Sequence, residues 1–215
     1  MSDQAHIVLI HGLYMRPLVM RPMARWFEAQ GYSTSSFGYK TTSESLELNV
    51  ENLSTHLSSI NANEVFLVCH SLGGLLARAY VASVGEDHTI RKVVTIGTPH
   101  QGAAIARWMK SKKLGSLLGH SMEKGLIKNR SDWDLDIPLG SIAGDGGIGF
   151  LPLIKGNAEP SDGTVSVSET HIQGETDHIV LHYSHIQLIM VAEVYEKALC
   201  FIKHSNFTSD SSGSS

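Results

Sequence analysis

The chain has 215 residues, of which 42% are hydrophobic and 18% are charged, and its formal net charge at pH 7 is −4. This is the composition of an ordinary globular protein with room for one sizeable domain, and the acidic balance argues against nucleic-acid binding through a basic surface. The 2 cysteines form no CxxC motif, which excludes a disulfide framework and a thiolate zinc site, and no apolar run approaches the length of a membrane-spanning helix.

Two further features bear on location and chemistry. The N-terminal stretch MSDQAHIVLIHG has no basic segment before its apolar run, so we expect no signal peptide and a cytoplasmic protein. Histidine is frequent, with 12 residues, and this residue type suggests either metal binding or acid–base chemistry.

Short apolar runs alternate with helical periodicity along the chain. In chain order, the patterns predict a strand over 6–10, a helix over 20–30, a strand over 32–39, a helix over 44–60, a strand over 64–69, a helix over 72–84, strands over 90–96, 139–143 and 178–182, and a helix over 186–203. This alternation indicates the α/β class, with a mostly parallel six-stranded sheet and helices on both faces. We expect one domain over 1–204, followed by a disordered Ser/Gly-rich tail over 205–215.

The loop after the third predicted strand reads 69-CHSLGG-74 and places a serine between an apolar strand and an apolar helix. A serine on such a sharp turn needs small neighbours, which Gly73 and Gly74 supply, and the start of the helix offers N–H groups for a developing oxyanion. The segment therefore has the context of a nucleophile elbow, with Ser71 as the nucleophile.

The elbow and the segment 7-IVLIHGLY-14 resemble the α/β-hydrolase family, specifically its small bacterial lipase and esterase branch. Cys69 stands where that family usually has the first glycine of its elbow motif. The resemblance implies that the backbone N–H groups of Leu13 and Leu72 form an oxyanion hole. It also implies a structural His11, and we expect Tyr14 and His70 to contact substrate.

A nucleophilic serine needs a base and an acid, and in this fold they follow in the order serine, acid, histidine. His185, in the loop before the last helix, is the expected base, with His182 as the alternative. Two acids follow the strand over 139–143. Asp162 lies in a DGTV segment that resembles the acid-bearing turn of bacterial lipases and is favoured; Asp145, in a Gly-rich turn, stays open.

The stretch 103–135 is too long for a plain connection and contains two helical patterns. In the family this position often carries a lid over the acyl pocket, so Trp108 and Met109 are expected to bind substrate; the alternative is that its apolar residues only cover the sheet. Seven Lys/Arg against one acid in 103–131 allow contact with an anionic lipid surface, whereas the simpler interpretation is a solvated helix face.

The resemblance implies a carboxylic ester hydrolase, an esterase or lipase, that acts through an acyl-enzyme on a small-molecule ester with an apolar acyl or alcohol part. A thioesterase or acyltransferase on the same triad, or a non-catalytic binding module, are the alternatives. A zinc hydrolase is disfavoured because no HExxH motif occurs, and we expect no metal, cofactor or nucleic-acid partner.

Overall fold

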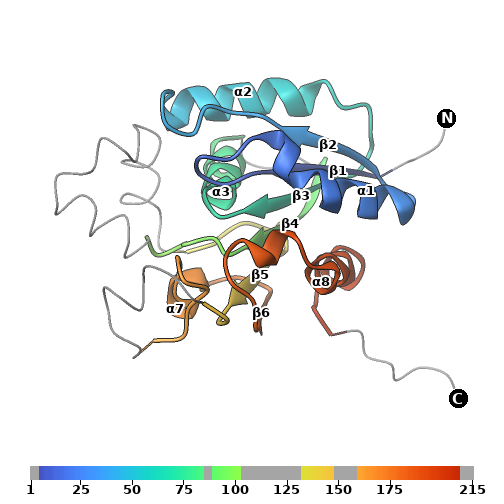
Figure 1. The fold of residues 1–215 in the computed structure, drawn as a ribbon. Helices are drawn as coiled ribbons and strands as arrows, with labels where there is room; N and C mark the ends of the chain where they lie inside the picture. The colour runs from blue at the N-terminus through green and yellow to red at the C-terminus, as the bar shows by residue number, and fades with distance from the viewer. Residues whose placement is uncertain (1–4, 85–88, 103–131, 148–158, 209–215) are drawn as a thin grey trace, which may run out of the picture.

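The computed structural model describes residues 5–84, 89–102, 132–147 and 159–208 (Figure 1). Its elements in chain order are β1 (His6–Ile10), η1 (Pro17–Met20), α1 (Arg21–Ala29), β2 (Ser33–Phe37), α2 (Leu46–Ser58), β3 (Val65–His70), α3 (Leu72–Val84), β4 (Ile90–Ile96), β5 (Leu139–Gly144), α7 (Val167–Thr170), β6 (Asp177–Leu181), η3 (Gln187–Ile189) and α8 (Ala192–His204). None of the helices described is long and apolar enough to cross a membrane.

The six strands form one sheet in the order β2-β1-β3-β4-β5-β6, and every neighbouring pair is parallel. Central strands of a parallel sheet are covered on both faces, which explains why all six residues of β3, VFLVCH, are buried. Because the strands are parallel, all their carboxyl ends lie along one edge, and the loops that follow β1, β3, β4, β5 and β6 meet there. The predicted fold class is confirmed.

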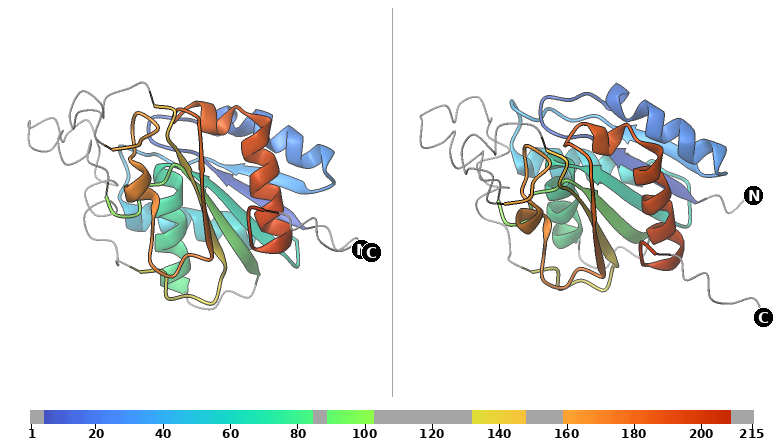
Figure 2. Two further views of the ribbon diagram at one scale, coloured as in Figure 1. Left: turned by 90° about the horizontal axis from the view of Figure 1, so that it is seen from below. Right: turned by 60° about the horizontal axis from the view of Figure 1, so that its bottom comes forward.

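Helices cover both faces of the sheet. Alternate residues of β1 show the division: Ile7 and Leu9 pack in the cluster that includes α1 and α8, whereas Val8 and Ile10 pack in the cluster with α2 and α3. Figure 2 shows α8 and α3 on opposite sides of the strands. The site is therefore carried by a rigid sheet that has a hydrophobic core on each face.

The last predicted helix, over 186–203, is split in the structure. A short turn, η3, buries Leu188 and Ile189, and the chain then becomes extended at Val191 before α8 begins. The hydroxyl of Tyr195 donates to the carbonyl of Ile189 at 2.7 Å and so satisfies a backbone group that the break exposes. The break lets α8 pack along the sheet in its own direction while the preceding loop stays at the carboxyl edge.

The prediction of disorder from residue 205 is wrong for 205–208. Phe207 is only 1% exposed, and its ring packs 5.0 Å from that of Phe201. Its N–H donates to Asp177 at 2.7 Å, and Lys197 donates to its carbonyl oxygen at 3.2 Å. One aromatic residue in a polar segment is enough to dock the chain after α8. Residues 209–215 lie outside the described part.

Most of the predicted lid also lies outside the described residues, including Trp108, Met109 and the basic stretch over 103–131. Residues 132–135 are described and contain no helix. Trp133 there is buried, and its indole N–H donates to the carbonyl of Ile137 at 2.7 Å.

Candidate active site

Ser71 occupies the sharp turn between β3 and α3, with a left-handed φ of 52°. Such a conformation costs a non-glycine residue about 1–3 kcal/mol and persists only where neighbouring groups hold it. Here the N–H of Ser71 donates to the carbonyl of Ile96 at 2.8 Å, and its own carbonyl accepts from the hydroxyl of Thr98 at 3.0 Å. The backbone at the end of β4 therefore fixes the serine in the geometry of a nucleophile elbow.

The glycines after Ser71 let α3 start close to the sheet, as the sequence predicts. A Cβ on Gly73 would lie 2.6 Å from the carbonyl oxygen of Ile10, and a Cβ on Gly74 would collide with the side chain of Thr98. Thr98 is a further residue of the site that was not named among the expected ones, and it lies directly after Gly97 in the loop that follows β4.

The loop after β1 lies directly beside the serine. A Cβ on Gly12 would be 3.0 Å from Cβ of Ser71, so the two backbones approach closely. The loop turns between Gly12 and Met15 with Tyr14 at a φ of 58°, and the N–H of Tyr14 donates to Thr41 at 3.2 Å. This turn carries Leu13 at the edge of the elbow.

Two backbone donors remain available at this place. Leu72 is the first residue of α3, where N–H groups have no partner within the helix. Within the described part of the chain, the N–H groups of Leu13 and Leu72 donate to no residue. An oxyanion hole requires free backbone donors next to the serine, and these two N–H groups meet that requirement.

Asp162 and His185 form a buried pair. Oδ2 of Asp162 lies 2.6 Å from Nδ1 of His185, and the Asp162 side chain is 1% exposed. The other oxygen, Oδ1, accepts from the N–H groups of Thr164 at 2.9 Å and Val165 at 2.7 Å. The backbone N–H of His185 donates to the carbonyl of Asp162 at 2.9 Å, so the two loops are joined twice. The acid thus has partners on both oxygens, and the imidazole ring is fixed by one of them.

This pair lies beside the elbow across the end of β4. A Cβ on Gly97 would be 3.1 Å from both Oδ2 of Asp162 and Nδ1 of His185, and Gly97 directly follows the residue that accepts the Ser71 N–H. Among the described residues, no hydrogen bond joins the Ser71 hydroxyl to His185. In hydrolases without substrate this contact is often long or poorly aligned and tightens in the complex.

The alternative acid and base pair with each other on the surface of the same sheet edge. Nδ1 of His182 lies 2.9 Å from Oδ1 of Asp145, and the His182 side chain is 88% exposed. Of the two pairs, Asp162–His185 is the buried one, and it lies against Gly97, which directly follows the residue that accepts the Ser71 N–H.

The prediction that His70 contacts substrate is wrong, because its side chain is 0% exposed. Its ring lies 4.6 Å from that of His185, and its Nε2 is 3.1 Å from the His185 carbonyl oxygen. Burial, and then the proximity of His185, hold the pKa of His70 well below its usual value. A neutral His70 therefore donates from Nε2 to the carbonyl oxygen of His185 and so stabilises the loop that carries His185. Tyr14, by contrast, is 62% exposed beside Leu13, where it can meet a substrate.

Two other side chains near the elbow are structural. His11 bonds within its own loop, with Nδ1 2.9 Å from the carbonyl oxygen of Gly12, and its ring stacks 4.7 Å from that of Tyr39. Cys69, close to the nucleophile in sequence, is fully buried in β3, and burial raises the pKa of its thiol. A thiol in this state is a poor nucleophile, so Cys69 does not compete with Ser71 as a candidate nucleophile.

The sheet order, the elbow after β3 and the acid–histidine pair supplied after β5 and β6 together define an α/β-hydrolase fold. Solved structures with this fold include the mature form of the Bacillus licheniformis lipase BlEst2, with a TM-score of 0.73, 20% identity and coverage of 94% of this chain and 92% of that chain. The carboxylesterase CesB from Bacillus subtilis matches with a TM-score of 0.62 and 11% identity, over 94% and 85% of the two chains. The metagenomic carboxyl esterase MGS0156 matches with a TM-score of 0.67 and 16% identity, over 86% and 65%.

A match to a family model of sequence places the chain in a family within this fold. The palmitoyl protein thioesterase family model matches residues 6–131, which is more than half of the chain. The chain belongs to this family, whose matched segment includes the loop after β1 and the whole elbow.

Proposed function

We propose that this protein is a serine hydrolase that cleaves esters or thioesters of apolar acyl groups through Ser71, His185 and Asp162. The observation that carries the proposal is the buried Asp162–His185 pair, 2.6 Å between Oδ2 and Nδ1, at the sheet edge where Ser71 occupies a strained elbow. Membership of the palmitoyl protein thioesterase family and the lipase and carboxylesterase structures with the same fold support this reaction class.

Each residue has a defined role in this proposal. His185 takes the proton of Ser71 as Oγ attacks the carbonyl carbon, and Asp162 holds the ring in the required tautomer and stabilises the imidazolium. The N–H groups of Leu13 and Leu72 donate to the oxyanion, and loss of one such donor typically costs about 3–4 kcal/mol. His185 then gives the proton to the departing alcohol or thiol. In the second half of the reaction His185 takes a proton from water as the water attacks the acyl carbon, and it returns a proton to Oγ of Ser71 as the acid product leaves.

An apolar acyl group fits the surroundings of the site. Large hydrophobic side chains are exposed on the two loops that carry Leu13 and His185: Tyr14 and Leu18 after β1, and Ile186 and Met190 after β6. Exposed apolar side chains on neighbouring active-site loops are suited to hold a hydrocarbon chain.

The family favours a thioester and the structural neighbours favour an oxygen ester, and the triad itself can cleave both. A thiol is a far stronger acid than an aliphatic alcohol, so a thiolate departs with less help from a general acid. Thioester cleavage therefore depends on His185 mainly as the base that activates Ser71, whereas cleavage of an alkyl ester needs both of its proton transfers.

The deciding experiment compares matched substrates with one acyl chain. Hydrolysis of palmitoyl-CoA, p-nitrophenyl palmitate and an alkyl palmitate, with shorter acyl homologues, is measured for wild type, Ser71→Ala and His185→Ala. The controls are Ser58→Ala and His204→Ala, which change the same residue types at exposed positions of α2 and α8. We expect losses on the order of 10⁴-fold or more in both site variants and none in the controls. Full activity of a folded Ser71→Ala would refute the triad, and a folded wild type inert toward every substrate would favour a binding module.

A further inference from the structure

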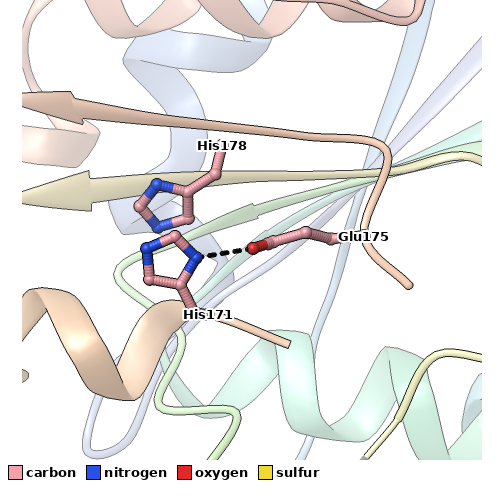
Figure 3. A group of neighbouring side chains, drawn as sticks. All are labelled: His171, Glu175 and His178. Atoms are coloured by element: carbon pink, nitrogen blue, oxygen red, sulfur yellow. Dashed lines mark hydrogen bonds and ion pairs between the residues drawn. The ribbon is translucent and has the colours of Figure 1, made fainter. Parts of the chain in front are cut away.

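Three side chains that commonly bind metal ions meet at the amino end of β6, outside the site described above (Figure 3). His171 follows α7, Glu175 belongs to the next turn, and His178 is the second residue of β6. One ligand atom from each lies within 4.8 Å of the others. Nδ1 of His171 is 2.7 Å from Oε1 of Glu175, and the rings of His171 and His178 are stacked with their centroids 3.6 Å apart.

The second carboxylate oxygen of Glu175 needs a partner. Oε2 is buried and makes no hydrogen bond within the described residues, and the side chain as a whole is only 11% exposed. An oxygen of a carboxylate that has lost its water and gained no donor is costly, so such groups in proteins are usually paired or bound to a cation. This oxygen is an observation independent of the clustering of the three residues, and it points to a positively charged ligand.

The backbone holds the three residues in a defined arrangement. The N–H of Glu175 donates to the carbonyl of Ile172 at 3.1 Å, and Gly174 has a φ of 89°, with its Cα against the carbonyl of Trp133. The next residue, Thr176, donates to the carbonyl of Leu139 at 2.8 Å. The turn is thus tied to the start of β5 and to Trp133, and a rigid support of this kind is what a metal site requires.

The ring of His178 is also held in place. Oγ1 of Thr170 lies 2.9 Å from Nε2 of His178 and donates its own proton to the carbonyl of Val167 at 2.7 Å. The hydroxyl therefore accepts from the ring and fixes its orientation. With its proton on Nε2, the neutral ring presents the lone pair of Nδ1, and the neutral form is the one in which histidine ligands bind metal.

We propose that His171, Glu175 and His178 bind one divalent transition-metal ion of the zinc type. Two imidazoles and one carboxylate suit Zn²⁺ and its neighbours, whereas Ca²⁺ and Mg²⁺ require oxygen ligands. Ligand atoms about a tetrahedral zinc ion are about 3.3 Å apart. The ligand atoms of the three side chains lie within 4.8 Å of one another. Binding therefore requires no distance between them to shorten by more than about 1.5 Å. His171, whose side chain is 50% exposed, has the space for that movement.

The position of this site assigns the ion a structural role. His178 lies at the amino end of β6, whereas His185 follows the carboxyl end of the same strand. The ion joins the end of α7 to β6 and thus closes the connection between the acid-bearing loop and the last strand. This inference does not depend on the proposed hydrolysis, since it concerns residues that the triad does not use.

The test is metal binding by the purified full-length chain after treatment with a chelator. Zn²⁺ is titrated in competition with a chromophoric chelator, and Co²⁺ is added as a probe whose visible absorption reports ordered coordination. The variants are Glu175→Gln and His178→Asn. The matched control is His182→Ala, which removes a histidine from another histidine–carboxylate pair, Asp145–His182, on the surface. Circular dichroism checks that each variant folds.

We expect one Zn²⁺ per wild-type chain and a rise in thermal midpoint on adding Zn²⁺. Loss of an outer-sphere partner typically lowers metal affinity about 10–100-fold. Each site variant loses a direct ligand, so its affinity should fall by more than that, whereas His182→Ala should bind like wild type. Weak binding that is the same in all four proteins, or affinity lost only in His182→Ala, would overturn the proposal. Ester hydrolysis is measured in parallel, and its Ser71-dependent rate should persist in chelator, so failure of one proposal is distinguishable from failure of the other.

Discussion

Mild acid should destabilise this protein, because the pKa of several of its histidines is lowered in the folded chain, and for the buried His70 and His100 it is well below the usual value. His70 is enclosed behind His185 and the loop of His11. His100 accepts from Arg78 at 3.2 Å through Nδ1 and is joined through Nε2 to Thr95 at 3.0 Å, so neither ring nitrogen has room for a further proton. Burial is the largest cause that lowers each pKa, followed by the charge of His185 for His70 and of Arg78 for His100.

The sign and size of the effect follow from proton linkage. In the unfolded chain each histidine has a pKa near 6.5, whereas in the folded chain the pKa of His70 and of His100 is well below that value. The unfolded state therefore binds more protons, and the stabilisation is complete above about pH 6.5 and is lost as the pH falls below it. From pH 7 to pH 5, protonation of the unfolded state lowers the free energy of unfolding by about 2 kcal/mol for each such histidine, or about 4 kcal/mol for the two. That is a large part of the stability of a typical domain.

The assay is urea unfolding, followed by tryptophan fluorescence at pH 7, 6 and 5, with chelator present so that no metal ion contributes. The free energy of unfolding should fall by at least about 4 kcal/mol from pH 7 to 5 with a constant m-value. His100→Gln should reduce this fall by about 2 kcal/mol, whatever its effect on stability at pH 7, and the exposed His204→Gln should not change it. A fall of less than about 1 kcal/mol in wild type, or an unchanged fall in His100→Gln, would refute the assignment of these rings as buried neutral groups.

Two other predictions test the acid and the C-terminal segment. Asp162→Asn should lower kcat by about 10⁴-fold with little change in KM in steady-state assays, because the imidazole would lose the partner that sets its tautomer. The kcat of Asp145→Asn should stay within a few-fold of wild type. The reverse ranking of the two variants would make Asp145 the acid. Phe207→Ala should lower the free energy of unfolding by about 3–5 kcal/mol in urea titrations, because its ring is 1% exposed against Phe201. A loss below about 1 kcal/mol would show that this segment is not docked in solution.

The sheet and its helices could be predicted closely because their signals are local. Helix α3 (Leu72–Val84) and strand β4 (Ile90–Ile96) have the bounds that the sequence predicts, since α3 is a strongly apolar helical run and β4 is rich in β-branched residues. The break between η3 and α8 could not be seen, because residues 186–203 keep helical periodicity throughout. There the tertiary packing of Leu188 and Ile189 overrides the local pattern.

The site was only partly predictable, because the paths of long loops decide which side chains meet. Both Asp145 and Asp162 follow β5, and spacing alone does not separate them. The turn after Asp162 does, since its N–H groups bind one carboxylate oxygen and leave the other for His185. The same limit applies to His171, Glu175 and His178, which match no metal motif in sequence and meet only because Gly174 turns the chain between them.

Within the described residues, histidine contacts a carboxylate in three places, and burial and position separate their roles. The Asp145–His182 pair is on the surface, with a His182 side chain 88% exposed, so water and salt screen its charges and it contributes little. Beside the His171–Glu175 pair lie Oε2 of Glu175, which is buried without a hydrogen-bond partner among the described residues, and the imidazole of His178, and this arrangement suits an added cation. Only the Asp162–His185 pair combines a nearly inaccessible carboxylate, with both oxygens bonded, and a place beside the strained serine. In that low-dielectric setting a carboxylate stabilises an imidazolium strongly, which is what the proposed transfer of the Ser71 proton requires, and an exposed pair of the same chemistry cannot do so.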